Sequence, residues 1–322
     1  MELIQKTEDL KSATIEAPDG LSVAILSLGA AIASIKVPTQ SGPVDAILSY
    51  PNVRDYLDDR YFLGSTVGPY ANRIGNGRFA LGGREYSLQR NETSTGHCLH
   101  SGESGLHRQY FDMHYERDDA RVTCRTVLPD GVGGFPGRRE IIVTYKLVND
   151  LCLAIGFQAI TDRNTVISLA NHAYFNLGGR VGELEIKVNS DTYTPVDESN
   201  LPTGEARRVA GSSFDLRTPT RIGDRVFDHN FALNRRGDEL QRAATLRNPL
   251  NNLQLDLYTT QPGLQVYTGD DLATPFASRE GLCLEAQGFP DAPNQPSFPS
   301  AHLAAGDSYR QLTAYKFSAL TS

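Results

Sequence analysis

The chain has 322 residues, of which 39% are hydrophobic and 21% are charged, so a sizeable core is possible and wholesale disorder is excluded. Its net charge of −7 and its pI of about 5.5 argue against a nucleic-acid binder, because such proteins usually present a basic face. The same balance fits a protein that handles a neutral or cationic small molecule.

The N-terminal segment, MELIQKTEDLKSATIE, is charged from Glu2 onward and has no apolar stretch typical of a signal peptide. The most apolar run, around Leu26 to Ile35, is too short to span a bilayer and contains Ser and Gly. We therefore expect a soluble, cytoplasmic protein that makes no membrane contact.

Strand patterns separated by turn residues dominate the chain. Two-residue turns are predicted at Gly82-Gly83, Asp118-Asp119 and Asn149-Asp150. The predicted strands are, in chain order, Leu21 to Leu28, Ala30 to Val37, Arg78 to Leu81, Glu85 to Leu88, His114 to Glu116, Arg121 to Val127, Glu140 to Val148, Leu151 to Gln158, Leu253 to Tyr258 and Tyr309 to Phe317.

Helical candidates are few and short. Pro51 to Asp59 is one, with Pro at the favoured first position, and Arg236 to Arg242 is a weaker one. No repeat, long linker or composition break divides the chain, so we expect one domain over residues 1–322. Strands at roughly 8- to 12-residue spacing predict an all-β sandwich, and the lack of alternating long helices argues against Rossmann and TIM architectures.

The cysteines predict thiols rather than a metal or disulfide framework. Cys98, Cys124, Cys152 and Cys283 form no CxxC pair. Because Cys124, Cys152 and Cys283 have apolar or strand-like neighbours, we expect them to be buried free thiols, which favours a reducing compartment.

The most informative segment is GLCLEAQGFPDAPNQPSFP, which begins at Gly281 and sets Glu285 at the end of a short apolar strand. Such a carboxylate is either an ordinary group exposed at the strand end or one partly buried at the floor of a cleft. Burial would raise its pKa and make it a usable general base near neutral pH.

Three other segments carry candidate chemistry. GPYANRIGNG contains Asn72 and Arg73, and an Arg can donate two parallel hydrogen bonds to neighbouring hydroxyls or serve as a structural ion-pair partner. CLHSGESG contains His100, which could instead cap a turn. NHAYFNL contains His172, either a proton donor or a satisfied core histidine. The other histidines show no metal-ligand spacing, and neither GxGxxG nor Walker spacing is present, so no metal or nucleotide site is expected.

Together these segments resemble the aldose 1-epimerase (galactose mutarotase) family over nearly the whole chain. The resemblance is carried by VGPYANRIGNGRFALGGREYSLQRN, CLHSGESG, DGVGGFPG, NHAYFNLGG, FDHNFAL, LQVYTG and CLEAQGFPDAPNQPSFP, in this order. It implies a large antiparallel β-sandwich of the galactose mutarotase type, with few short helices and with the sugar in an open cleft on one sheet.

The resemblance also implies roles for individual residues. Glu285 would be the base for the anomeric hydroxyl, His172 the acid for the ring oxygen, and His100 a further catalytic group near that oxygen. Asn72, Arg73, Asp228 and Gln265 would hold hydroxyls. The substrate would be a free monosaccharide, and neither a cofactor nor a metal would be needed. The protein would be a monomer or a homodimer, without a nucleic-acid partner.

The chain departs from the family pattern at three places. Ser101-Gly102 replaces the usual Gly-Gly after the histidine, and Pro69-Tyr70 replaces the usual pair before ANR. The chain has no tryptophan, and Tyr110 and Phe111 occupy the region where one commonly occurs. A lost indole would change the apolar wall under the sugar. Galactose and glucose both stay open as substrates.

Other functions compete with mutarotation. An epimerase of phosphorylated hexoses would want extra Arg or Lys around the cleft. A sugar-binding module could keep Arg73 and Asp228 but would not need a paired acid and base. A β-sandwich scaffold for protein contacts would depend on none of these residues.

Overall fold

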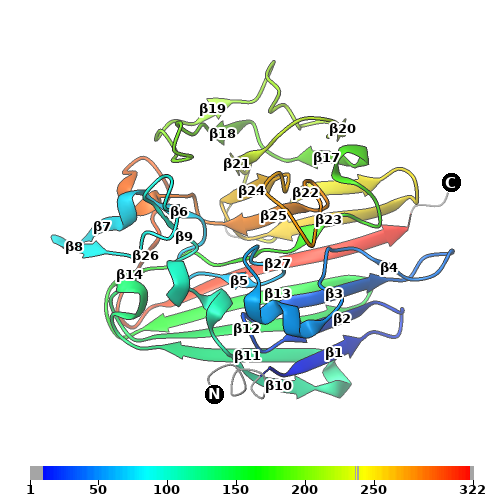
Figure 1. Cartoon of the computed structure of the whole chain (residues 1–322), viewed down its shortest axis with the longest axis horizontal. Coiled ribbons are helices and arrows are strands. Elements are labelled where there is room, and N and C mark those ends of the chain that lie inside the picture. The colour runs from blue at the N-terminus through cyan, green and yellow to red at the C-terminus, as the bar shows by residue number, and fades with distance from the viewer. Residues whose placement is uncertain (1–9, 236, 238, 320–322) are drawn as a thin grey trace.

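The computed structural model describes residues 10–235, 237 and 239–319. Its largest element is a nine-stranded antiparallel sheet, in which the C-terminal strand β27 (red) lies between β13 (green) and β23 (yellow) in Figure 1. In spatial order, the strands of this sheet are β10 (Asp112–Glu116), β11 (Arg121–Leu128), β12 (Arg139–Val148), β13 (Cys152–Thr161), β27 (Ser308–Ala319), β23 (Leu253–Thr259), β22 (Gln241–Asn248), β17 (Glu185–Val188) and β20 (Thr220–Arg221).

Two smaller antiparallel sheets carry the remaining long strands. The four-stranded sheet contains β1 (Ser12–Glu16), β2 (Ser22–Leu26), β3 (Ile32–Val37) and β4 (Val44–Asp45). The six-stranded sheet contains, in spatial order, β16 (Tyr174–Phe175), β25 (Leu282–Gln287), β24 (Gly263–Tyr267), β21 (Asp228–Ala232), β18 (Thr192–Thr194) and β19 (Arg207–Arg208).

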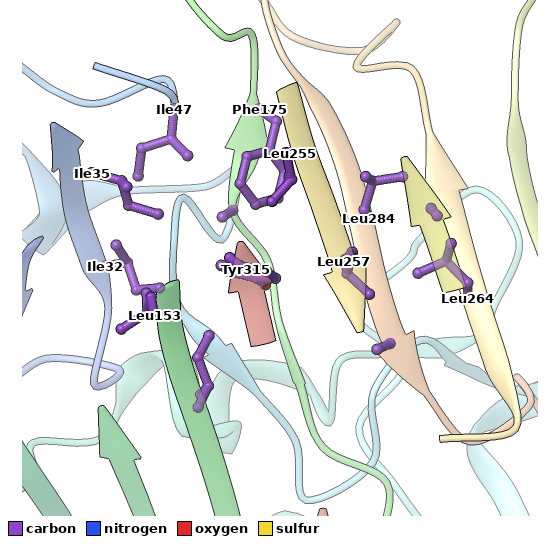
Figure 2. Close-up of a cluster of buried hydrophobic side chains, with 14 of the residues drawn as sticks. Ile32, Ile35, Ile47, Leu153, Phe175, Leu255, Leu257, Leu264, Leu284 and Tyr315 are labelled. Atoms are coloured by element: carbon purple, nitrogen blue, oxygen red, sulfur yellow. The ribbon is translucent and has the colours of Figure 1, made fainter. Parts of the chain in front are cut away.

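The core lies between these sheets, as period-2 alternation requires. Strand β12 alternates buried and partly exposed side chains along most of its length. Figure 2 shows the result: Ile32 from β3, Leu257 from β23, Leu264 from β24 and Leu284 from β25 gather in one apolar cluster. The predicted all-β sandwich is confirmed.

Short pairs and turns complete the fold. The two-stranded sheets pair β5 (Thr66–Val67) with β15 (Ala170–Asn171), β6 (Arg73–Ile74) with β9 (Cys98–Leu99), β7 (Arg78–Leu81) with β8 (Arg84–Ser87), and β14 (Thr165–Val166) with β26 (His302–Leu303). The described helical segments are short 3₁₀ turns: η1 (Val53–Asp58), η2 (Gly75–Gly77), η3 (Gly102–Ser104), η4 (Leu106–Arg108), η5 (Arg117–Asp119), η6 (Val132–Gly134), η7 (Val181–Glu183) and η8 (Ala292–Asn294).

Two predicted turns had different outcomes. Gly82 and Gly83 both adopt positive φ and join β7 to β8, which confirms the two-residue hairpin. The predicted Asn149-Asp150 turn is one residue longer, because Asp150 and Leu151 both adopt positive φ and Val148 pairs with Cys152.

The helix predictions need two corrections. Pro51 lies before the helix: Asn52 caps η1 by accepting the Arg54 N–H, so the turn begins at Val53. The predicted helix from Arg236 to Arg242 is wrong at its end, because Gln241 and Arg242 belong to β22 and pair with β23. Arg236 itself lies outside the described residues.

All four cysteines are free thiols, as was expected for Cys124, Cys152 and Cys283. Cys124 and Cys283 are buried, but Cys152 is partly exposed because it stands at the first position of β13; Cys98 is buried as well. Within the described part of the chain, no helix has the length and apolar character needed to cross a membrane.

Candidate active site

A cavity of about 250 Å³ opens where the six-stranded sheet meets the β5–β6 and β8–β9 connections. Its wall combines acids, bases and aromatic rings that come from segments far apart in the sequence. The lining residues include Asn72, Arg73, His100, His172, Asp228 and Glu285, together with Phe62, Glu92, Tyr174, Tyr267, Arg60 and Asp271. Six of the seven predicted site residues therefore converge on one cavity; Gln265 lies beside it.

Glu285 lies inside β25, not at the strand end that the sequence suggested. Alternation directs its neighbours Leu284 and Ala286 into the core cluster and leaves Glu285 on the cavity face. The residue is only 2% exposed, and its Oε2 has no hydrogen-bond partner among the residues that the structure describes. Burial, followed by the nearby Asp228 carboxylate, raises the pKa of Glu285 to about 8.

His172 lies between β15 and β16, where its main-chain N–H donates to Ser65 O. Its Nε2 is 3.8 Å from Glu285 Oε1, and its Nδ1 is 3.5 Å from Cys283 Sγ. The rings of Phe62 and Tyr174 flank the imidazole at centroid distances of 5.6 and 5.1 Å. Burial lowers the pKa of His172 to about 4.

His100 is fixed by a reciprocal pair of bonds to Asn72. The His100 N–H donates to Asn72 O at 3.1 Å, and the Asn72 N–H donates to His100 Nδ1 at 3.1 Å. An Nδ1 that accepts a bond places the proton of the neutral ring on Nε2. Burial lowers the pKa of His100 well below its ordinary value, so the ring stays neutral. His100 thus holds a turn together and offers an Nε2–H donor.

Arg73 joins two carboxylates in the cavity wall. Its Nε is 2.9 Å from Glu92 Oε2, its second terminal nitrogen is 2.9 Å from Glu92 Oε1, and its first is 3.3 Å from Asp228 Oδ2. Gln265 Nε2 donates to Asp228 Oδ1 at 2.6 Å. Arg73 is therefore an ion-pair partner as well as a wall residue, and Gln265 orients Asp228.

His100, His172 and Glu285 each offer a donor atom, and these atoms lie within 4.8 Å of one another. A metal would need a lone pair on each histidine nitrogen that faces it. The Nδ1 of His100 already accepts from Asn72, so its remaining nitrogen carries the proton. The cluster is therefore arranged for hydrogen bonding and proton transfer rather than for metal ligation.

Sequence reasoning missed several wall residues. Glu92 directly follows the segment VGPYANRIGNGRFALGGREYSLQRN, and its charge was the signal that could have revealed it. Phe62, Tyr174 and Tyr267 supply the aromatic wall, whereas Phe111 is packed in the core cluster. Tyr174 and Tyr267 lie within the NHAYFNL and LQVYTG segments, but nothing in these segments marked the two rings as wall residues, because only the fold brings them together with Phe62.

Two departures from the family pattern form one hydrogen-bond network. The Ser101 hydroxyl accepts from Tyr70 N at 2.9 Å and donates to Tyr70 O at 3.1 Å. The Tyr70 hydroxyl donates to Phe289 O at 2.7 Å and accepts from Ala292 N at 2.9 Å. This network connects the segments on either side of the cavity without lining it.

Comparisons with known proteins agree with this geometry. The chain matches the model of the family described as aldose 1-epimerase over residues 11–316. It is 37% identical to galactose mutarotase of Mus musculus, with 93% of this chain and 92% of the relative covered, and 33% identical to aldose 1-epimerase of Escherichia coli, with 92% of each covered. Two solved structures are similar to it: galactose 1-epimerase from Lactobacillus acidophilus (TM-score 0.86, 30% identity, 96% and 94% covered) and an aldose epimerase homologue from C. elegans (TM-score 0.90, 26% identity, 97% and 100% covered).

Proposed function

The chain belongs to the aldose 1-epimerase family, isomerases that interconvert the anomers of aldoses, and we propose that Glu285 and His172 carry out this reaction as base and acid. One observation carries the proposal: a buried carboxylate with an unpartnered oxygen lies 3.8 Å from an imidazole nitrogen at a monosaccharide-sized cavity. We propose free aldohexoses as the substrates, since relatives are named for galactose.

The reaction requires one proton to leave the anomeric hydroxyl and one to reach the ring oxygen. Glu285 takes the first and His172 Nε2 gives the second, so the C1–O5 bond breaks and an open-chain aldehyde forms. Rotation about the C1–C2 bond then presents the other carbonyl face. Reclosure returns the proton from Glu285 to the new anomeric oxygen and takes the ring-oxygen proton back onto His172.

The pair needs a single shared proton throughout this cycle. With the pKa of Glu285 raised to about 8 and that of His172 lowered to about 4, the pair holds one proton near neutral pH, and burial favours the neutral form of both groups, with that proton on Glu285. The proposed roles require the proton on His172, so a proton shift within the pair precedes ring opening. His100 would stabilise negative charge on the reacting oxygen through its Nε2–H.

The wall charges disfavour a phosphorylated sugar. Arg73 is already paired with Glu92 and Asp228, and Arg60 shares the cavity with Asp271. A phosphate would meet these carboxylates without an unpaired Arg cluster to bind it. The cavity therefore suits a neutral sugar better.

Polarimetry on freshly dissolved α-D-galactose and α-D-glucose tests the function. We expect the wild type to accelerate mutarotation of at least one sugar and Glu285→Gln to lose this activity, on the order of 100-fold or more, because the base is gone. The wild-type ratio of the two sugars measures specificity. A folded wild type that accelerates neither would contradict the proposal.

His172→Asn separates the acid from its neighbour. We expect a loss of similar size, since Asn cannot donate a proton to the ring oxygen. Retained activity would move the acid role to His100. If an inactive Glu285→Gln variant still binds galactose, Glu285 contributes to catalysis rather than to binding.

A further inference from the structure

We propose that Cys283 is a positioning residue whose sulfur accepts a hydrogen bond from Nδ1–H of His172 and so leaves Nε2 as the nitrogen that exchanges the proton. This inference rests on the proposed acid role of His172. It gives a role to a buried thiol that exchanges no proton with the sugar in the proposed reaction.

The geometry places the imidazole between two groups of β25. Cys283 Sγ lies 3.5 Å from Nδ1, and Glu285 Oε1 lies 3.8 Å from Nε2 on the other side of the ring. The two β25 residues are separated by one position, so they share the cavity face of the strand. Cys283 also pairs in register with Tyr174, two residues after His172, which fixes the thiol against the imidazole.

The state of Nδ1 decides whether His172 can act as a reversible acid. An imidazolium that loses the Nε2 proton must keep the one on Nδ1, and it then has an Nε2 lone pair with which to take the proton back. If the thiol donated to Nδ1 instead, the neutral ring would carry its proton permanently on Nε2. That ring could hydrogen-bond to a sugar oxygen, the role proposed for His100, but could not recover a proton.

Two observations favour the Nδ1–H form. Glu285, whose pKa is raised to about 8, keeps its proton near neutral pH and lies 3.8 Å from Nε2, so this nitrogen faces a proton donor with its lone pair and the ring proton lies on Nδ1. Cys283 is fully buried, and burial raises the pKa of its thiol well above the ordinary value. The sulfur therefore stays a neutral thiol, which accepts through a lone pair when Nδ1 carries the ring proton.

Sulfur is a weak acceptor, and this has a consequence for the acid. A carboxylate at this position would stabilise the imidazolium strongly, whereas a neutral thiol orients the ring and leaves it a strong acid once it is protonated.

The titratable groups facing His172 from the surrounding segments are His100, His107, Tyr174, Asp228, Cys283 and Glu285.

The direct test is the tautomer of His172 in the wild type. Two-bond ¹H–¹⁵N correlation spectra, with the His172 signals assigned by their loss in His172→Asn, should show a protonated Nδ1 and an unprotonated Nε2 at neutral pH. A protonated Nε2 in the neutral ring would overturn the proposal. This measurement does not depend on activity, so its failure is distinct from a failure of the mutarotase assay.

Variants then link the tautomer to the rate. In Cys283→Ala we expect mixed tautomers and a kcat lower on the order of tenfold, the usual cost of losing a partner that orients a functional histidine, with little change in KM. Cys283→Ser keeps an acceptor and should retain the tautomer and most of kcat. Cys124→Ala removes a buried thiol from the core cluster and should change neither readout.

A loss of kcat in Cys283→Ala with an unchanged tautomer would make the role merely structural and overturn the proposal. So would an unchanged tautomer and an unchanged kcat. If Cys283→Ala does not fold, the wild-type tautomer and the Cys283→Ser variant still decide the question.

Discussion

The pKa values of Glu285 and His172 are shifted in opposite directions by the same cause. Burial disfavours the charged form of each, so it raises the pKa of the carboxyl and lowers that of the imidazole. The result is a pair that shares one proton across the neutral range. This is the property that a reversible proton exchange with a sugar needs.

We expect a bell-shaped pH profile of kcat/KM with limbs near the two pKa values, about 4 and about 8. Below the lower limb the pair binds a second proton and has no base. Above the upper limb it loses its only proton and has no acid. Mutarotation rates from pH 3.5 to 9.5 would check this, and a profile that keeps rising past pH 9 would contradict the shared proton.

The raised pKa of Glu285 also predicts how stability changes with pH. Its folded-state pKa of about 8 exceeds the ordinary 4.5, so its contribution is present below the ordinary value and is lost as the pH rises through 8. Glu285→Gln removes this loss. By urea unfolding, the variant should gain stability relative to the wild type between pH 5 and pH 9, on the order of 1–4 kcal/mol.

A destabilised Glu285→Gln at pH 9 would show that the carboxylate has a structural partner in the ionised state. The same comparison at pH 4.5 is the internal control, because both side chains are then largely neutral and the difference should be small.

At the scale of elements, the site is assembled by tight connections between short strands. Asn72 and His100 both adopt positive φ, and their reciprocal bonds bring the end of the β5–β6 connection onto the segment after β9. Ser101 and Tyr70 extend this contact toward Ala292 in η8. Ser101 and Tyr70, which depart from the family pattern, therefore support the segment that carries His100 and do not line the cavity.

Tyr70→Phe tests this support. The change removes the shorter bonds of the Phe289 carbonyl and the Ala292 N–H and leaves only their mutual bond of 3.3 Å, so we expect a loss of stability of about 1 kcal/mol. Because Tyr70 does not line the cavity, the KM for sugar should change little. Chemical denaturation and polarimetry at a permissive temperature would check both, and a large rise in KM with unchanged stability would contradict the assignment.

At the scale of the whole molecule, one apolar cluster includes residues from the nine-, four- and six-stranded sheets. Leu284 and Leu264 lie on the far face of the strands that carry Glu285 and Gln265, so the core and the site share their backbone. Anything that separates the sheets should also dismantle the acid–base pair.

We therefore predict one cooperative unfolding transition, the behaviour that the single domain expected from the sequence should show. Loss of mutarotase activity and loss of the far-ultraviolet circular dichroism signal should coincide along a urea titration. Two separated transitions, with activity lost in the first, would instead divide the chain into independent folding units.

Much of the framework could be predicted from the sequence. Alternation along Leu253 to Tyr258 and the Gly82-Gly83 turn are local signals, and local backbone preferences decide such elements. The short helical segments were less predictable. Asn52, not Pro51, caps the start of η1. The segment predicted as a helix from Arg236 to Arg242 ends in strand β22, because pairing with β23 overrides a weak helix propensity.

The sequence by itself determined the all-β class and which residue types could do acid–base chemistry. Only the tertiary structure decided that Glu285 is buried within a strand, that Asn72 sets the tautomer of His100, and that Phe62, Tyr174 and Tyr267 form the aromatic wall of the cavity. Strand alternation is encoded over neighbouring residues, whereas burial, pKa and hydrogen-bond partners depend on groups up to about two hundred positions away, which meet only when the sheets pack.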